Sequence, residues 1–354
     1  MKGLYIHIPF CSAKCDYCDF YSISYDGKII EKYVSFLKEK INSLTDSFDT
    51  VYFGGGTPSI IGGDNIADIL SCVKLNDNAE VTVECNPNSA TAEFFSKIAA
   101  KGVNRVSIGL QSANSEELKF LTRKHSPQDA AKAVQNAKAA GITNISLDVM
   151  LGLYNQTEQT LIQTLNFCTD LDVTHISAYM LHIEPSTPMS RFDESLLPDG
   201  DEQARLYLSL CEQLNKKGYE QYEISNFSKS GYRCRHNMIY WNCDEYLGLG
   251  PAAHSFYKGK RFYYPRDIEY FINDNPPIDD GEGGGFNEYV MLRLRLSEGL
   301  IFDQLKQRGF TLDKSFIDKC CLMQKQGLLT MDEQGIRLNS KGFLVQNLIL
   351  DKLL

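Results

Sequence analysis

Two rhythms of apolar and polar positions alternate along the first two-thirds of the chain. Short runs rich in β-branched and aromatic residues predict six strands, at Leu4–Ile8, Thr50–Phe53, Glu80–Glu84, Arg105–Leu110, Asn144–Leu151 and Thr174–Leu181. Between them the apolar residues return at helical spacing, over Ile29–Ile41, Ala92–Ala99, Ala130–Ala139 and Leu161–Cys168. Alternating βα units predict a parallel sheet, and six units favour an α/β fold with a partial (βα)6 TIM-like barrel over an open doubly wound sheet.

Helix ends are marked by polar residues and glycines. Asp64, Thr91 and Thr157 are candidate N-caps, and Gly102 and Gly141 follow two of the helical stretches. In such a barrel the chemistry sits where the strands end, at their carboxyl ends.

The pattern changes after residue 258, which predicts a barrel over 1–258, a linker over 259–286 and a small domain over 287–354. The linker carries Asn275-Pro276-Pro277 and a glycine-rich run, Gly281–Gly285. The small domain combines helices with a hairpin, as a winged-helix-like α+β module does; its elements are Asn287–Leu296, Phe302–Arg308, Asp313–Gln326, Gly327–Thr330, Ile336–Leu338 and Phe343–Leu354. Because it has no basic recognition helix, we expect it to pack or dock rather than bind DNA.

The composition is that of a folded protein without a nucleic-acid surface. Of 354 residues, 43% are hydrophobic and 38 are Phe or Tyr (19 of each), which excludes disorder. The net charge of −9 argues against a basic face for nucleic acid. The chain starts directly with a short strand, and no run approaches about 20 apolar residues, so we expect neither a secretion signal nor a membrane span. Eleven cysteines then predict a cytoplasmic, reducing setting, with metal or redox chemistry rather than disulfides.

Three cysteines stand in a loop directly after the first strand. Cys11, Cys15 and Cys18 follow the spacing C-x-x-x-C-x-x-C, and aromatic residues flank them. Clusters that only carry electrons usually take four cysteines, so three predict a 4Fe–4S cluster with one iron open to another ligand. The alternatives are a structural zinc site, for which no second cysteine pair lies at usable spacing, and unrelated buried thiols.

This loop resembles the signature of the radical S-adenosylmethionine (SAM) superfamily. A longer string resembles the oxygen-independent coproporphyrinogen III oxidase group, and within that group the HemW haem chaperones: Tyr5-Ile6-His7-Ile8-Pro9-Phe10-Cys11. The resemblance extends from Tyr5 to about Phe256, with a weaker match over Asn287–Leu329. It implies the barrel fold, a 4Fe–4S cluster on the three cysteines, and SAM as a second cofactor.

Glycine and polar residues at the strand ends are candidates for a SAM pocket. Gly54-Gly55-Gly56-Thr57-Pro58 follows the second strand, where glycine lets backbone approach a ligand, although a plain tight turn has the same pattern. Single charged residues at strand ends are often only solvated, but several together favour a polar pocket. The resemblance implies that SAM, or in the oxidases a second SAM, contacts Tyr5, Tyr17, Gly55, Gly56, Thr57, Glu84, Gln111, Arg123 and Asp148.

A second motif distinguishes chaperones from oxidases. The oxidases have a further cysteine where this chain has Phe20, and an extension ahead of the first strand. The string His236-Asn237-Met238-Ile239-Tyr240-Trp241 matches the H-N-x-x-Y-W signature of the chaperones. An imidazole can ligate haem iron, and aromatic rings offer flat apolar surface to a porphyrin. The resemblance therefore implies haem binding at His236, Asn237, Tyr240 and Trp241.

Alternatives remain open for this motif. A buried histidine bonded to its surroundings beside core aromatic residues has the same pattern, and Cys234 or Cys243 are alternative iron ligands. We expect His236 to face the open end of the barrel, above the cysteine loop.

Two functions from different classes follow. The first is a haem chaperone that binds haem and delivers it to haem-dependent acceptor proteins, with an electron donor such as flavodoxin or ferredoxin. The alternative is an oxygen-independent coproporphyrinogen III oxidase, which decarboxylates its substrate through a 5′-deoxyadenosyl radical. A third is a radical SAM enzyme with an unrelated substrate. The absent cysteine at Phe20 and the H-N-x-x-Y-W string favour the chaperone.

Overall fold

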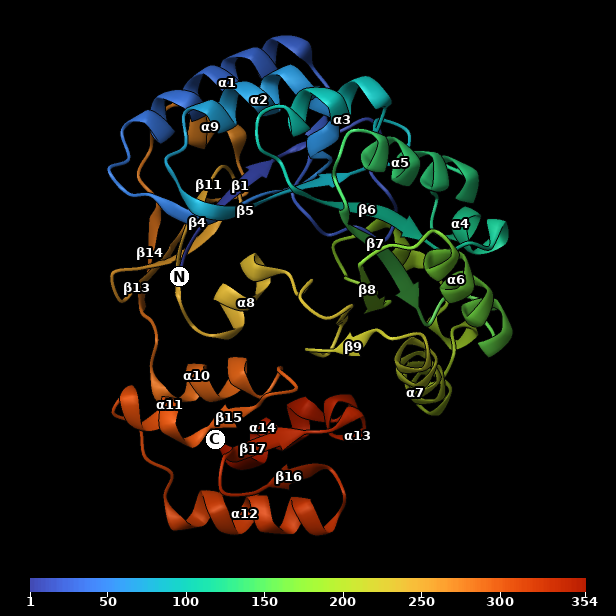
Figure 1. The fold of residues 1–354 in the computed structure, drawn as a ribbon, viewed down its shortest axis with the longest axis vertical. Helices are drawn as coiled ribbons and strands as arrows, with labels where there is room; N and C mark the ends of the chain where they lie inside the picture. The colour runs from blue at the N-terminus through green and yellow to red at the C-terminus, as the bar shows by residue number, and fades with distance from the viewer.

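A computed structural model describes residues 1–354 and is built around a curved sheet of twelve strands. Six of these strands are parallel and adjacent in chain order, which confirms the predicted units (Figure 1). They are β1 (Lys2–Ile8), β4 (Phe48–Gly55), β5 (Leu75–Cys85), β6 (Arg105–Gln111), β7 (Asn144–Leu151) and β8 (His175–Met180). The helices that cover the convex face are α1 (Gly27–Asn42), α2 (Gly63–Ser71), α3 (Ala92–Ala99), α5 (Pro127–Ala139) and α6 (Glu158–Asp170).

The strands alternate between an apolar and a polar face. Residues such as Phe53, Val83 and Leu147 are fully buried, and they belong to the core that includes apolar residues of the helices. Successive side chains of a strand point to opposite faces, so the positions between them point into the barrel. These inward positions are polar, as with Thr50 and Asp148. The barrel therefore has an apolar outer face and a polar interior.

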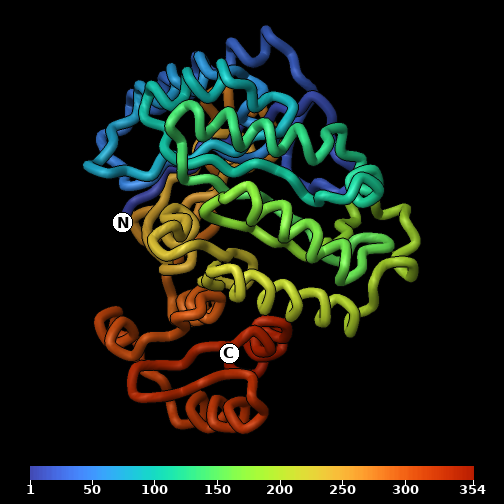
Figure 2. The backbone as a smooth tube through the Cα atoms, turned by 45° about the vertical axis from the view of Figure 1, so that its right-hand side comes forward, coloured from blue at the N-terminus to red at the C-terminus, as the bar shows by residue number.

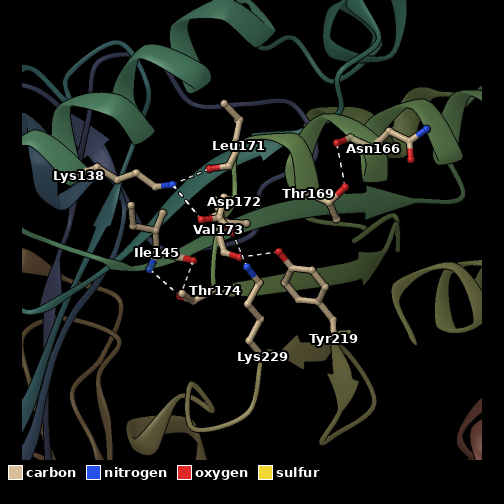
Figure 3. A network of polar contacts seen from close by, with 10 residues as sticks. All are labelled: Lys138, Ile145, Asn166, Thr169, Leu171, Asp172, Val173, Thr174, Tyr219 and Lys229. Carbon is tan, nitrogen blue, oxygen red and sulfur yellow. Dashed lines mark hydrogen bonds and ion pairs between the residues drawn. The ribbon is translucent and has the colours of Figure 1, made fainter. Parts of the chain in front are cut away.

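Helix ends follow the sequence signals at most positions. Thr91 and Thr157 accept hydrogen bonds from the backbone of α3 and α6, and Gly102 and Gly141 take positive φ after α3 and α5. Asp64 is not a cap: Gly62 holds that position, and Asp64 pairs with Lys97 from the first turn of α2. Between α6 and β8 the chain is fixed by a polar network, in which Lys138 donates to the carbonyls of Leu171 and Asp172 (Figure 3).

The segment 259–286 is not a free linker. It contains two strands, β13 (Lys260–Tyr263) and β14 (Ile278–Glu282), with the helix α9 (Ile268–Ile272) between them. The two strands continue the large sheet through β12 (His254–Tyr257) and β11 (Glu245–Leu249). Lys258 and Gly259 both have positive φ and form the two-residue turn of a hairpin between β12 and β13. Its prolines and glycines therefore belong to turns and strand ends of the sheet.

Two short strands, β10 and β9, form the opposite edge of the sheet, and several small elements complete the barrel. β10 (Asn226–Ser228) pairs antiparallel with β8, and β9 (Glu220–Gln221) pairs with β10. The remaining elements are β2 (Phe10–Cys11), β3 (Ile23–Ser24), α4 (Ser115–Phe120), α7 (Gly200–Lys216) and α8 (Arg235–Trp241), with 3-10 turns at Pro58–Ile61, Pro188–Arg191 and Glu194–Leu196. Helix α8 lies on the concave side of the sheet (Figure 1).

The C-terminal part is a winged-helix-like α+β unit, as expected. Its antiparallel sheet has the order β15-β17-β16, with β15 (Leu300–Ile301), β16 (Leu329–Met331) and β17 (Gly335–Leu338). Its helices are α10 (Phe286–Arg293), α11 (Phe302–Gln307), α12 (Lys314–Lys325), α13 (Ser340–Leu344) and α14 (Gln346–Leu353), so the closing helix is divided at Val345. The unit packs against α7 and α8 (Figure 2). None of the helices combines the length and apolarity that crossing a bilayer requires.

Candidate active site at the strand ends

A cavity of about 700 Å³ lies at the carboxyl ends of the parallel strands, within the range of small-molecule sites. It is lined by residues from the cysteine loop, from all of β4 to β8 and from the loops after them. Eight of the nine residues that the resemblance assigns to SAM line it together: Tyr17, Gly55, Gly56, Thr57, Glu84, Gln111, Arg123 and Asp148. Tyr5 is the exception, because it lies below the cavity, stacked against Tyr52 with ring centroids 6.3 Å apart.

The cysteine loop borders this cavity. The Cys11 thiol lies 3.4 Å from the Thr57 hydroxyl, and the guanidinium of Arg123 donates to the Cys15 sulfur at 3.5 Å. Cys18 lines the cavity itself. Burial raises the pKa of the Cys18 thiol, and the neighbouring Cys15 and Cys11 thiols raise it further. All three cysteines are partly exposed, and none is in a disulfide.

The donor set fits a cluster better than a single ion. No three His, Cys, Asp or Glu side chains converge around one metal position, which a tetrahedral zinc site requires. A 4Fe–4S cluster instead takes each cysteine on a different iron. Cys85 also lines the cavity, but its thiol donates to the carbonyl of Val83 at 3.6 Å. The arrangement thus offers three thiols beside a cavity that has room for a further ligand.

The glycine loop brings backbone to the cavity wall. Gly55 has a φ of +110°, and a Cβ there would lie 2.6 Å from the His7 ring. A Cβ on Gly56 would lie 2.7 Å from the carbonyl oxygen of Phe10. Both positions therefore require glycine because of the close approach of β1 and the loop after it. The amide of Gly55 donates to Glu84 at 3.3 Å.

Two partly buried carboxyls line the cavity and have raised pKa values. Burial raises the pKa of Glu84 to about 7, although the Tyr52 hydroxyl, which donates to it at 2.8 Å, opposes the shift. Burial raises the pKa of Asp148 to about 6, and Ser107 donates to this carboxyl at 2.9 Å. Groups of this kind cluster at functional sites. Both are suited to accept hydrogen bonds from hydroxyl or ammonium groups of a ligand.

A guanidinium completes the polar wall. Arg123 donates to the carbonyl of Gly109 at 2.9 Å, and its Nε is buried without a hydrogen-bond partner. A positive guanidinium at the cavity wall can bind an anionic group of a ligand. Gln111 stands beside it in the left-handed region, with φ of 69°. The polar residues of this wall fit the carboxylate, ammonium and ribose groups of SAM.

The predicted haem motif lies elsewhere. His236, on α8, is fully buried; its Nδ1 is 2.7 Å from the Thr50 hydroxyl and its Nε2 is 2.8 Å from the Tyr240 hydroxyl. Thr50 is near the start of β4, so His236 sits at the amino ends of the strands, opposite the cysteine loop. The expectation that it faces the open end was wrong. Both imidazole nitrogens are engaged, and burial lowers the pKa of His236 to about 3.

The comparisons agree with this geometry. A model described as the radical SAM superfamily matches residues 5–168, and one described as the HemN C-terminal domain matches residues 286–345. Heme chaperone HemW of Lactococcus lactis is 31% identical to this chain, and the match covers 100% of this chain and 97% of the relative. Heme chaperone HemW of Bacillus subtilis is 30% identical, and the match covers 98% of this chain and 97% of the relative. The chain belongs to the HemW family. The solved coproporphyrinogen III oxidase from Escherichia coli shares the fold, with a TM-score of 0.85 at 19% identity over 99% of this chain and 89% of the other.

In this HemW family member the other named residues of the H-N-x-x-Y-W motif, Asn237, Tyr240 and Trp241, are partly buried. The guanidinium carbon of Arg295 lies 4.4 Å from the centroid of the Trp241 ring. Cys234 and Cys243, on either side of the motif, are buried. Asn237 is partly exposed on the same helix. The backbone amides of Arg235 and His236 each donate at 3.0 Å to the Glu80 carboxylate. The motif thus closes the base of the barrel in this structure.

Several residues that line the cavity were not predicted from the sequence. Tyr52, Ser107 and Tyr179 line the cavity, and each occupies an inward position of a parallel strand. The signal was present, because polar residues alternate with buried apolar ones along each of these strands. His182 and Arg266, at the outer part of the cavity, lie on loops that no periodicity marks.

Proposed function

We propose that this protein is a haem chaperone, which binds haem and delivers it to haem-dependent acceptor proteins. The observation that carries this proposal is the match of the full chain to relatives named heme chaperone HemW. Phe20, which replaces the further cysteine of the oxidase signature, supports the same function. A transfer protein must release its ligand, so we expect a haem dissociation constant in the micromolar range, which corresponds to a binding free energy of about −8 kcal/mol. A protein that holds haem permanently would bind it more tightly.

We further propose that Cys11, Cys15 and Cys18 hold a 4Fe–4S cluster beside SAM. When bound, this pair supplies one-electron chemistry at the sulfonium of SAM. The electron would come from a donor protein such as flavodoxin or ferredoxin. The free state of all eleven cysteines supports a reducing, cytoplasmic setting.

The chain's own residues bind and orient SAM in this proposal. Glu84 and Asp148 accept hydrogen bonds from its hydroxyl and ammonium groups, and the Arg123 guanidinium pairs with its carboxylate. The backbone of Gly55 and Gly56 forms part of the cavity wall beside the ligand. Tyr52 closes the floor of the cavity and excludes water from below.

The coproporphyrinogen III oxidase function is the second candidate, because the fold of that enzyme covers nearly the whole chain. The two are separated by one set of measurements on anaerobically reconstituted protein. With reductant and SAM, we expect no conversion of coproporphyrinogen III to protoporphyrinogen IX, whereas a haem titration should give a saturable Soret change. Release of carbon dioxide over multiple turnovers would favour the oxidase, and absence of haem binding would refute the chaperone.

A further inference from the structure

The outer part of the cavity carries residues that the SAM site does not use. They come from three segments: Phe20 from the cysteine loop, Tyr179 and His182 from the end of β8 and the loop after it, and Arg266 from the turn before α9. Phe20 is 67% exposed and Tyr179 is 44% exposed. Two large rings are thus left open to solvent at the mouth of the cavity, directly beside the cysteine loop.

His182 is the histidine of this chain that lines the cavity and keeps a free ring nitrogen. Its side chain is 81% exposed, and its Nε2 lies 3.6 Å from a Glu184 carboxylate oxygen. Four other histidines have a ring nitrogen bonded to a protein atom and are buried: His7, His125, His175 and His236. The sixth, His254 on β12, stacks on Tyr263 of β13 and does not line the cavity.

A cation stands on the same rim. The Arg266 side chain is 59% exposed and forms one ion pair, with Asp19 at 2.8 Å. Guanidinium has five N–H donors, so a single carboxylate partner leaves it able to bind a second. The mouth of the cavity therefore combines an imidazole, exposed aromatic rings and a positive charge, which together match an iron porphyrin: a metal that takes imidazole, a flat apolar ring and propionate groups.

We propose that haem docks at the mouth of this cavity with the His182 imidazole as an axial ligand. Phe20 and Tyr179 contact the macrocycle, and Arg266 pairs with a propionate. This inference rests on the proposed haem-chaperone function and names the site of its cargo. It also explains how haem binds without opening α8, since the His236 ring is enclosed by Thr50 and Tyr240. Haem at this place lies directly over the SAM pocket and the cysteine loop.

The test is a haem titration of the full-length protein, reconstituted with its cluster, followed by the Soret band. His182→Ala should shift the band and weaken binding by about tenfold or more, because an axial ligand is lost. His254→Ala is the matched control and should change neither. Added imidazole should restore the parental spectrum of His182→Ala, because it replaces the missing ligand. Phe20→Ala should weaken binding without moving the band.

The outcomes separate this inference from the proposed function. If the parent protein binds no haem, the proposed function fails and the docking site fails with it. If the parent binds haem and His182→Ala keeps the same spectrum and affinity, the docking site is wrong while the chaperone function stands. A changed spectrum that imidazole does not restore would also overturn the inference, because the substitution would then have distorted the site rather than removed a ligand.

Discussion

Tyr52 lies face to face with His236, with ring centroids 5.1 Å apart and the ring planes inclined by 27°. The hydroxyl of the same tyrosine donates to Glu84 at 2.8 Å. Tyr52 therefore joins the motif at the base of the barrel to the carboxyl in the candidate SAM pocket. With Tyr240 bonded to His236, the contacts run without interruption from α8 to the cavity.

This contact predicts a pH-dependent effect of Tyr52→Phe on SAM binding. The hydroxyl of Tyr52 lowers the pKa of Glu84, so its removal should raise that pKa above about 7. More Glu84 is then protonated at neutral pH, and the affinity for SAM should fall roughly tenfold there, the size of a lost charged hydrogen bond. The SAM affinity of the variant should return toward that of the parent as the pH rises toward 9, because Glu84 is then ionised again. Calorimetric titration of SAM across this range measures the shift.

Tyr5→Phe is the control for this measurement, because the Tyr5 hydroxyl contacts His7 at 3.1 Å rather than Glu84. The pH midpoint of SAM binding should stay unchanged in that variant. If Tyr52→Phe also leaves the midpoint in place, Tyr52 does not set the protonation of Glu84.

The cysteine loop gives the second prediction. Anaerobically reconstituted protein should carry about four iron atoms per chain, the content of one 4Fe–4S cluster. Joint replacement of Cys11, Cys15 and Cys18 by Ala should remove this iron. Three partly exposed cysteines outside the loop provide the matched control, by replacement with Ser: Cys72, Cys211 and Cys321. Full iron content in the loop variant would refute the cluster assignment.

Asp148 gives the third prediction, through Asp148→Asn. This substitution keeps the size of the side chain but removes the charge of a carboxylate whose pKa burial raises to about 6. SAM affinity should fall about tenfold or more at pH 8, and the difference from the parent should narrow below about pH 6, where the parental carboxyl is also protonated. Iron content should stay unchanged. Equal SAM affinity at pH 8 would show that this carboxyl is structural.

The sequence predicted the parallel barrel and most of the cavity because both depend on local patterns. Each strand carries its own alternation, and residues at strand ends meet wherever parallel strands align. The place of His236 depends instead on long-range contacts, since its partners Thr50 and Glu80 stand 186 and 156 positions away. No periodicity within α8 indicates which end of the barrel it covers. The prediction of a linker over 259–286 was wrong for another reason, because glycine and proline occur in hairpin turns as well as in linkers.

His236→Ala tests whether the motif histidine holds the barrel closed. The substitution leaves the hydroxyls of Thr50 and Tyr240 without their partner in a buried place and creates a cavity. We expect a loss of about 2–4 kcal/mol in the free energy of unfolding, from the unpaired groups and the lost packing. Urea unfolding monitored by circular dichroism measures it. His254→Ala, at an exposed position of β12, should stay within about 0.5 kcal/mol of the parent; an equally small effect at His236 would contradict the structural role.

The same variant should change how stability depends on pH. Burial holds the pKa of His236 at about 3 in the folded protein, whereas an unfolded histidine titrates near about 6.5. The unfolded chain therefore binds the proton first, and the stability present above about pH 6.5 is lost as the pH falls toward 3. The His236→Ala variant has no imidazole at this position, so it does not lose stability through this protonation. The stability gap between parent and variant should therefore narrow by about 1.4 kcal/mol for each pH unit below about 6. A gap that stays constant from pH 7 to pH 5 would mean that burial does not lower the pKa of His236 in the folded protein.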